Sequence, residues 1–164
     1  MANMFSDLEG VRIAMAMEAR GRDFYQQAYQ LTPNPTHKEL FLWLKNEEIH
    51  HLTRFTALFE MLENRKEAHS AEYLFDTDTS RYLTVIAEEH VFPKPNDAGE
   101  QFAGLTSVQA ILQAALQAEK DSVLFYDELA AKAKFPEARD VFRLLKGEEQ
   151  AHVVKIREMV DAWA

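Results

Sequence analysis

The sequence predicts an all-α protein, a four-helix bundle in which one long crossover joins the second helix to the third. Two observations predict this fold. The 164 residues include only 5 Gly and 5 Pro, too few for a turn-rich β fold, and a long helical pattern occurs twice. A hydrophobic fraction of 47% and a charged fraction of 27% are ordinary for a globular protein. We therefore expect a single domain over residues 1–164, long enough to bury a substantial core.

The helical pattern is an internal repeat with an offset of 101 residues. It runs from about Val11 to Leu52 without a gap. Because both copies keep the same spacing, we expect two similar helical hairpins, over residues 7–64 and 106–163. The identical pairs are Ala14/Ala115, Glu18/Glu119, Phe24/Phe125, Tyr25/Tyr126, Pro35/Pro136, Phe41/Phe142, Leu44/Leu145, Lys45/Lys146, Glu47/Glu148, Glu48/Glu149 and His51/His152.

Local signals mark where the four helices begin. Ser6 with Glu9, and Thr106 with Gln109, have the spacing of a capping box before long apolar-periodic runs. The second helix of each hairpin begins at a proline, whose missing N–H would have no partner in a first helical turn. The predicted helices span residues 7–31, 35–64, 106–133 and 136–163.

Residues 65–105 form the predicted crossover between the hairpins. This segment contains a predicted short helix near Ser80 to Glu89 and a loop-rich stretch at residues 92–97. Helices of about 28 residues are roughly 40 Å long, and a connection of this size can return along the whole bundle. The second hairpin can therefore pack against the first with pseudo-two-fold symmetry.

Each predicted helix has an apolar seam at three- and four-residue spacing, and ionisable residues interrupt all four seams. The first and third helices each place one Glu in mid-seam. The second and fourth helices each place a Glu and a His three residues apart, and so on one helix face. The seam positions are Val11, Ala14, Glu18, Gly21, Tyr25, Ala28; Phe41, Leu44, Glu48, His51, Phe55, Leu58, Leu62; Leu112, Ala115, Glu119, Ser122, Tyr126, Leu129; and Phe142, Leu145, Glu149, His152, Ile156, Met159, Trp163.

The ionisable seam residues are candidate metal ligands. An uncompensated buried ion costs several kcal/mol, whereas two divalent cations would balance four carboxylates, and two neutral imidazoles complete a ligand set suited to Fe or Mn. A lone His or a lone Glu-x-x-His is more often a hydrogen-bonded core feature, but duplication in register favours a two-metal site. The six candidates are Glu18, Glu48, His51, Glu119, Glu149 and His152.

Four further repeated residues lie close to these candidates. Glu47 and Glu148 are one position off the seam, where we expect contact with the ligands or with solvent rather than with the metal. Tyr25 and Tyr126 fall one heptad beyond the seam glutamates. They either hydrogen-bond a ligand carboxylate across the bundle or fill the core.

Two small residues, Gly21 and Ser122, lie one turn from Glu18 and Glu119. They either leave room beside a metal pair for a bridging oxygen species or allow close helix packing. His50 has no counterpart in the second copy, where Ala151 stands, so we expect it at the surface or beside the ligands.

Composition excludes several other functions. With no Cys, the chain has no disulfide, thiolate zinc site, iron–sulfur cluster or Cys-ligated iron. A net charge of −9 offers no basic stripe for nucleic acid or an anionic membrane. Residues 1–7 lack a signal-peptide pattern, and no window approaches the roughly 18 apolar residues of a membrane span. We therefore expect a cytoplasmic protein.

These motifs resemble the ferritin-like superfamily, and within it the rubrerythrin-like proteins, over essentially the full chain. The motif Leu-x-x-Glu-Glu-x-x-His occurs at Leu44 and at Leu145, and the run from Glu119 to Leu129 is similar to the third bundle helix of that group. The resemblance implies a ferritin-like bundle whose six candidate residues bind a non-haem di-iron centre, with Mn as the alternative metal. It also implies reaction with hydrogen peroxide or dioxygen.

Two departures from the rubrerythrin pattern are visible. Rubrerythrins have an additional carboxylate one turn after the third-helix ligand, and here that position is Ser122, which puts their redox-linked ligand exchange in doubt. The Cys-rich rubredoxin domain is absent, so the resemblance implies an external electron-donor protein.

Three functions follow as hypotheses. The first is a peroxide-reducing or dioxygen-reducing enzyme, and the second is a ferroxidase or iron-storage protein. The third is a metal-free helical scaffold, which the six seam charges disfavour. Trp43 lies off the seam of the second helix, so we also expect a homodimer or a higher homo-oligomer.

Overall fold

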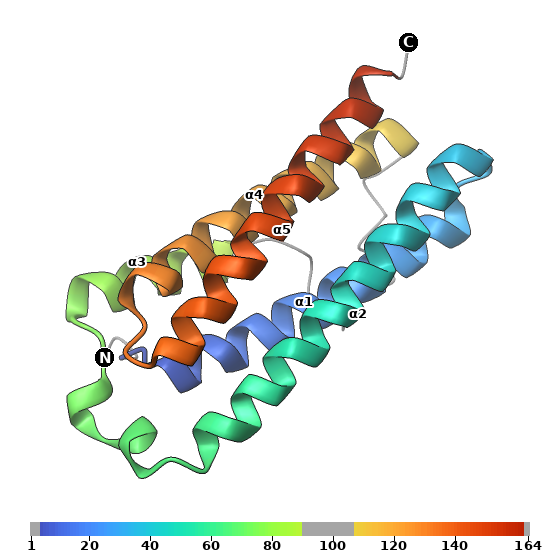
Figure 1. Cartoon of the computed structure of the whole chain (residues 1–164). Helices are drawn as coiled ribbons and strands as arrows, with labels where there is room; N and C mark the ends of the chain where they lie inside the picture. The colour runs from blue at the N-terminus through green and yellow to red at the C-terminus, as the bar shows by residue number, and fades with distance from the viewer. Residues whose placement is uncertain (1–3, 90–106, 163–164) are drawn as a thin grey trace.

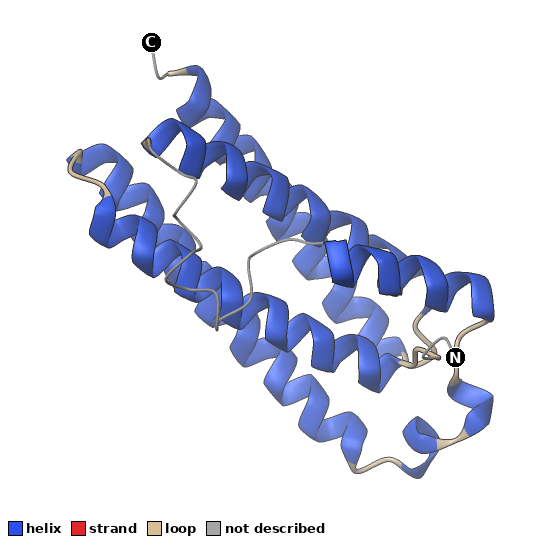
Figure 2. Ribbon diagram, turned by 180° about the vertical axis from the view of Figure 1, so that it is seen from behind, coloured by secondary structure: helices blue, strands red, loops and turns tan. Residues whose placement is uncertain are grey.

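The computed structural model describes residues 4–89 and 107–162, and every regular element in these two ranges is a helix. The all-α bundle predicted from the sequence is confirmed (Figure 2). No helix in the described ranges is both long and apolar enough to cross a membrane. The α-helices are α1 (Asp7–Leu31), α2 (Pro35–Glu63), α3 (Thr77–Glu89), α4 (Val108–Lys132) and α5 (Pro136–Asp161), and 3₁₀ turns lie at Lys66–His69 and Ala71–Tyr73.

The helices form two hairpins joined by a long crossover. Helices α1 and α2 pack along each other, as do α4 and α5, and these two pairs build the bundle (Figure 1). The crossover carries the two 3₁₀ turns at one end of the bundle and then α3, which packs against α4. The predicted short helix near Ser80 is therefore real but begins three residues earlier, at Thr77. The loop-rich stretch at residues 92–97 lies outside the described residues.

The helix starts agree with the sequence signals, with one correction. The Ser6 hydroxyl accepts from the Glu9 N–H at 3.2 Å, as a capping box requires, although the Glu9 carboxylate pairs with Arg12 instead. The predicted Thr106 cap is wrong, because α4 begins later and the Ser107 hydroxyl accepts from the Ala110 N–H.

Both prolines start their helices as expected, Pro35 in α2 and Pro136 in α5. Asn34 is a cap that we did not predict: its side chain accepts from the Thr36 and His37 N–H groups at the start of α2. The ends of α2, α4 and α5 fall one or two residues before the predicted positions, where the last turns give way to caps.

The predicted seams form the core. Every described seam position is buried except Met159, which is partly buried, and Trp163 lies outside the described residues. Two apolar clusters fill the two ends of the bundle. On α2, Leu44 belongs to one cluster and Phe55 to the other, with Glu48 and His51 between them. The ionisable residues therefore form one level between two apolar layers.

One buried carboxylate joins the two hairpins at the end of the bundle. Asp7, the first residue of α1, is 1% exposed and accepts hydrogen bonds from the Lys134 and Phe135 N–H groups at 2.8 and 2.7 Å. Phe135 is the N-cap of α5 and has no side-chain oxygen to satisfy the free N–H groups there. Asp7 therefore caps a helix of the other hairpin.

Replacing Asp7 by Ala should lower the free energy of unfolding by about 1–3 kcal/mol, because the Lys134 and Phe135 N–H groups lose a buried acceptor. Asp78→Ala is the matched control, since Asp78 is an exposed acidic residue in the first turn of α3. Urea denaturation of the two variants measures the difference. Equal stability of the two variants would show that solvent satisfies the N–H groups of the α4–α5 turn.

Candidate metal centre

The structure brings all six candidate ligands together at one level of the bundle. One Glu comes from each of α1 and α4, and a Glu and a His come from each of α2 and α5. All six side chains are 0–2% exposed. Their ligand atoms form two groups, in each of which every atom lies within 4.8 Å of the others. These groups are Glu18, Glu48, His51 and Glu149, and Glu48, Glu119, Glu149 and His152.

The two groups overlap in a way that suits two ions. Glu48 and Glu149 belong to both groups, whereas each remaining Glu belongs to one group with one His. One carboxylate from each hairpin is therefore placed to be shared. Each ion would contact one imidazole.

Both histidines face the carboxylates with the same ring nitrogen. The Nδ1 atom of His51 lies 3.2 Å from Glu149 Oε1 and 3.4 Å from Glu18 Oε2. The Nδ1 atom of His152 lies 2.9 Å from Glu149 Oε2 and 3.6 Å from Glu119 Oε1. The two rings are nearly parallel, at 10°, with centroids 5.4 Å apart. Their Nδ1 atoms are therefore the natural metal ligands.

Close as they are, these groups do not satisfy each other by hydrogen bonding. The buried atoms with no hydrogen-bond partner include both Nδ1 atoms and one oxygen of each glutamate: Glu18 Oε2, Glu48 Oε1, Glu119 Oε2 and Glu149 Oε2. Buried polar atoms are seldom left in this state. Carboxylate oxygens and imidazole nitrogens that converge without pairing fit a divalent cation of the Fe or Mn type.

Two tyrosines hydrogen-bond Glu119 and Glu18, the two glutamates that belong to one group only, from across the bundle. The Tyr25 hydroxyl donates to Glu119 Oε1 and the Tyr126 hydroxyl donates to Glu18 Oε1, each at 2.5 Å. The hydrogen bond across the bundle, one of the two roles expected for these tyrosines, is therefore present. Burial and then the nearby carboxylate charge raise the pKa of both hydroxyls, so they remain donors. Each bond uses Oε1 and leaves Oε2 facing the cluster.

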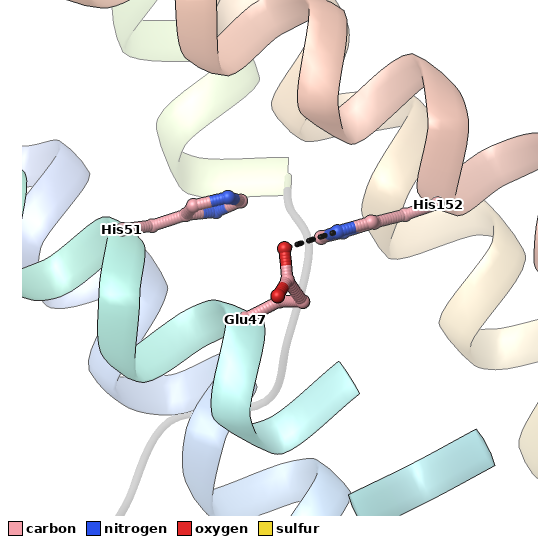
Figure 3. A group of neighbouring side chains, drawn as sticks. All are labelled: Glu47, His51 and His152. Atoms are coloured by element: carbon pink, nitrogen blue, oxygen red, sulfur yellow. Dashed lines mark ion pairs between the residues drawn. The ribbon is translucent and has the colours of Figure 1, made fainter. Parts of the chain in front are cut away.

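Glu47 and Glu148 contact the outward edges of the histidine rings. Glu148 Oε2 lies 2.9 Å from His51 Nε2, and Glu47 Oε2 lies 3.8 Å from His152 Nε2. Figure 3 shows the carboxylate of Glu47 reaching from α2 toward the ring of His152. Each of these glutamates therefore reaches a histidine of the other hairpin, on the side away from the buried carboxylates.

The remaining seam and surface residues lie as follows. Gly21 and Ser122 are buried on the inner faces of α1 and α4. His50 is exposed, 3.6 Å from Glu47. The position of Trp43 was not predicted. Its ring packs edge-on against His152, with the ring centroids 5.2 Å apart, and Lys155 Nζ lies 4.2 Å from the centre of the Trp43 ring. Its counterpart in the repeat is Leu144, so the repeat carried no signal for this contact.

The buried carboxylates differ in the direction of their pKa shifts. Burial, reinforced by neighbouring negative charge, raises the pKa of Glu48 and Glu149 well above the usual value. Burial opposes ionisation of Glu119 too, but close contact with Glu149 and His152 and the hydrogen bond from Tyr25 outweigh it and lower the pKa of Glu119 to about 2. The shared carboxylates are therefore the ones that hold protons when no cation is bound.

The histidines hold protons for the same reason. Burial alone would lower the pKa of His152, but its close contacts with Glu119 and Glu149 and their negative charge raise it to about 10. The pKa of His51 is also raised, since its contacts with Glu149, Glu18 and Glu48 outweigh its burial. Two imidazolium ions thus balance two ionised carboxylates in the metal-free cluster.

Comparison with known proteins agrees with this geometry. Residues 110–163 match the family model for rubrerythrin. The fold is similar to the crystal structure of a candidate ferritin-like diiron-carboxylate protein from Thermotoga maritima, with a TM-score of 0.75, 20% sequence identity and 98% of each chain covered. No curated protein matches the chain. The ferritin-like fold is thereby confirmed, and with it the resemblance to rubrerythrin-type proteins.

Charge balance predicts how many protons a metal pair displaces. Four ionised carboxylates and two neutral imidazoles together carry a charge of −4. Four added protons make this cluster electrically neutral, whichever of its groups bind them. Two divalent ions supply +4 in their place. Binding of two Co²⁺ ions near neutral pH should therefore release about four protons per chain, and affinity should fall steeply as pH falls.

Calorimetry in two buffers of different ionisation enthalpy measures this release. The variant Glu119→Gln serves as the comparison: its cluster holds about three protons and binds fewer ions, so it should release fewer protons per chain than the unmodified protein. Release of no protons from the unmodified protein would mean that the ions bind away from the buried cluster.

Proposed function

We propose that this chain is a di-iron oxidoreductase that reduces hydrogen peroxide, or dioxygen, at a metal pair held by the six buried residues. The observation that carries the proposal is the convergence of unpaired, buried ligand atoms in two groups that share Glu48 and Glu149. The rubrerythrin match and the ferritin-like fold support it. The metal is iron, with manganese as the alternative. The proposed ligands are Glu18, Glu48, His51, Glu119, Glu149 and His152.

The bound metal would supply Lewis acidity and two electrons for cleavage of the O–O bond. Reduction of hydrogen peroxide consumes two electrons and two protons and gives two water molecules. Because the chain has no Cys, no iron–sulfur or rubredoxin-type centre in it can supply the electrons. We therefore propose an external electron-donor protein as the partner, in the cytoplasm.

The chain's own residues prepare the site in three ways. The four buried carboxylates balance two divalent ions, so the reduced site is neutral in the core. The Tyr25 and Tyr126 hydroxyls fix the orientation of Glu119 and Glu18. The apolar layers on both sides of the ionisable residues exclude water from the site, which limits side reactions. Gly21 and Ser122 are small, and we place the peroxide beside the metal pair next to them.

The second candidate is a ferroxidase or iron-storage protein. It is favoured by Glu47 and Glu148, whose partly exposed carboxylates connect the buried cluster to solvent. Either function can operate in a homodimer or a larger homo-oligomer, which we also propose. The two candidates differ in whether iron stays in the site after it is oxidised.

Replacing Glu119 by Gln should remove at least one metal ion per chain. The change leaves a buried cation short of one carboxylate, at a cost of about 3–5 kcal/mol. The matched variant Asp127→Asn removes an exposed carboxylate from the same helix, α4, and should keep both ions. Metal analysis after equilibrium dialysis checks this, and equal metal content in the two variants would exclude Glu119 as a ligand.

The chemically reduced, iron-loaded protein should oxidise faster with hydrogen peroxide than with dioxygen. It should then return to the reduced state when an electron donor is added, with both irons retained. We expect this because four carboxylates without a fifth at Ser122 form a nearly symmetric set that keeps its charge through the cycle. Stopped-flow absorbance with each oxidant at equal concentration, followed by iron analysis of the desalted protein, measures both points.

The storage hypothesis predicts the opposite pattern. Faster oxidation by dioxygen, together with progressive uptake of many irons per chain, would overturn the peroxidase proposal. Loss of iron after each oxidation would do the same, since a peroxidase must keep its metal.

A further inference from the structure

The two histidine rings present a second pair of ligand atoms outside the buried cluster. Each ring has two nitrogens, and the buried carboxylates face only Nδ1. The Nε2 atoms of His51 and His152 are also buried and have no hydrogen-bond partner. They lie toward Glu148 and Glu47. The rings are stacked almost in parallel, so their outward edges lie side by side.

The two histidines and a carboxylate on this side are spaced for a cation of their own. Glu47, His51 and His152 each place one ligand atom within 4.8 Å of the other two (Figure 3). Glu148 is not one of these three residues, but its carboxylate oxygen lies 2.9 Å from His51 Nε2. Two carboxylates and two imidazoles form a donor set for Fe²⁺, Co²⁺ or Zn²⁺, and their charge of −2 balances one such ion.

Exposure sets the order in which a cation reaches these groups. The side chains of Glu47 and Glu148 are 25% and 37% exposed, whereas the histidines are 1% exposed and the inner glutamates are equally buried. The histidine rings therefore lie between two solvent-accessible carboxylates and four buried ones. On this side of the bundle, a cation from solvent meets Glu47 and Glu148 first.

We propose that Glu47 and Glu148, with the Nε2 atoms of His51 and His152, form an outer binding site through which a divalent cation passes to the inner centre. The proposal rests on the metal centre described under the proposed function. It assigns Glu47 and Glu148 a role in metal loading.

The chemistry of imidazole makes the outer site a step in loading rather than a third resident site. A neutral imidazole has one lone pair, so a ring that binds a cation through Nε2 cannot bind another through Nδ1. In the metal-free protein both rings are imidazolium ions, so a cation that binds Nε2 displaces the Nε2 proton to solvent and leaves Nδ1–H. When the ion moves inward to Nδ1, the remaining proton moves to Nε2, and Nε2–H can donate to Glu148 or Glu47. The loaded protein therefore holds two ions per chain.

The rate of Co²⁺ uptake tests this proposal. Stopped-flow absorbance gives the association rate constant for the metal-free protein, and chelator competition gives the dissociation rate constant. In the double variant Glu47→Gln, Glu148→Gln, association should be at least tenfold slower, with two ions still bound at saturation. The matched control, Glu63→Gln with Glu158→Gln, removes two exposed carboxylates from the same helices and should load at the unmodified rate.

Each outcome decides the proposal. An unchanged association rate with faster dissociation would overturn it, because Glu47 and Glu148 would then only hold the rings. An equal slowing in the control variant would also overturn it, by showing a general charge effect. Should the double variant not fold, each single variant must slow association at least threefold. Failure of the unmodified protein to bind two ions would instead refute the metal centre itself.

Discussion

The structure depends on the burial of six ionisable side chains at a single level of a helical bundle. No apolar packing can offset several uncompensated charges in such a place, so the level must be neutralised by protons or by cations. The apolar layers on both sides intensify this constraint, because they exclude the water that would otherwise solvate the charges. The stability of the fold therefore depends on neutralising these charges as well as on the hydrophobic core.

Several of the polar contacts at this level cross from one hairpin to the other. Tyr25 reaches Glu119, Tyr126 reaches Glu18, and Glu148 reaches His51. Within each hairpin, the two helices also pack along their lengths. The charged level thus specifies how the two hairpins align, since a shift of one helical turn would leave every one of these groups without its partner.

Periodicity and repetition were sufficient to predict most of the fold and all six clustered side chains. Seam spacing identified Glu48 and His51 as one face of a helix, and the repeat gave the same result for α5. Features without a counterpart were not predictable in this way. Asp7 corresponds to Val108 and Trp43 to Leu144, so neither interaction leaves a repeated signal. The outward contacts of Glu47 and Glu148 depend on how α2 and α5 face each other, which local spacing does not encode.

The asymmetry at Trp43 makes one half of the centre optically distinct from the other. Indole emission is sensitive to charge near the ring, and Trp43 touches His152 edge-on while its counterpart, Leu144, does not fluoresce. Conversion of His152 from imidazolium to a metal ligand changes the charge beside that ring, whereas the same event at His51 is more remote. The chain thus contains an intrinsic fluorophore that reports on one half of a nearly symmetric site.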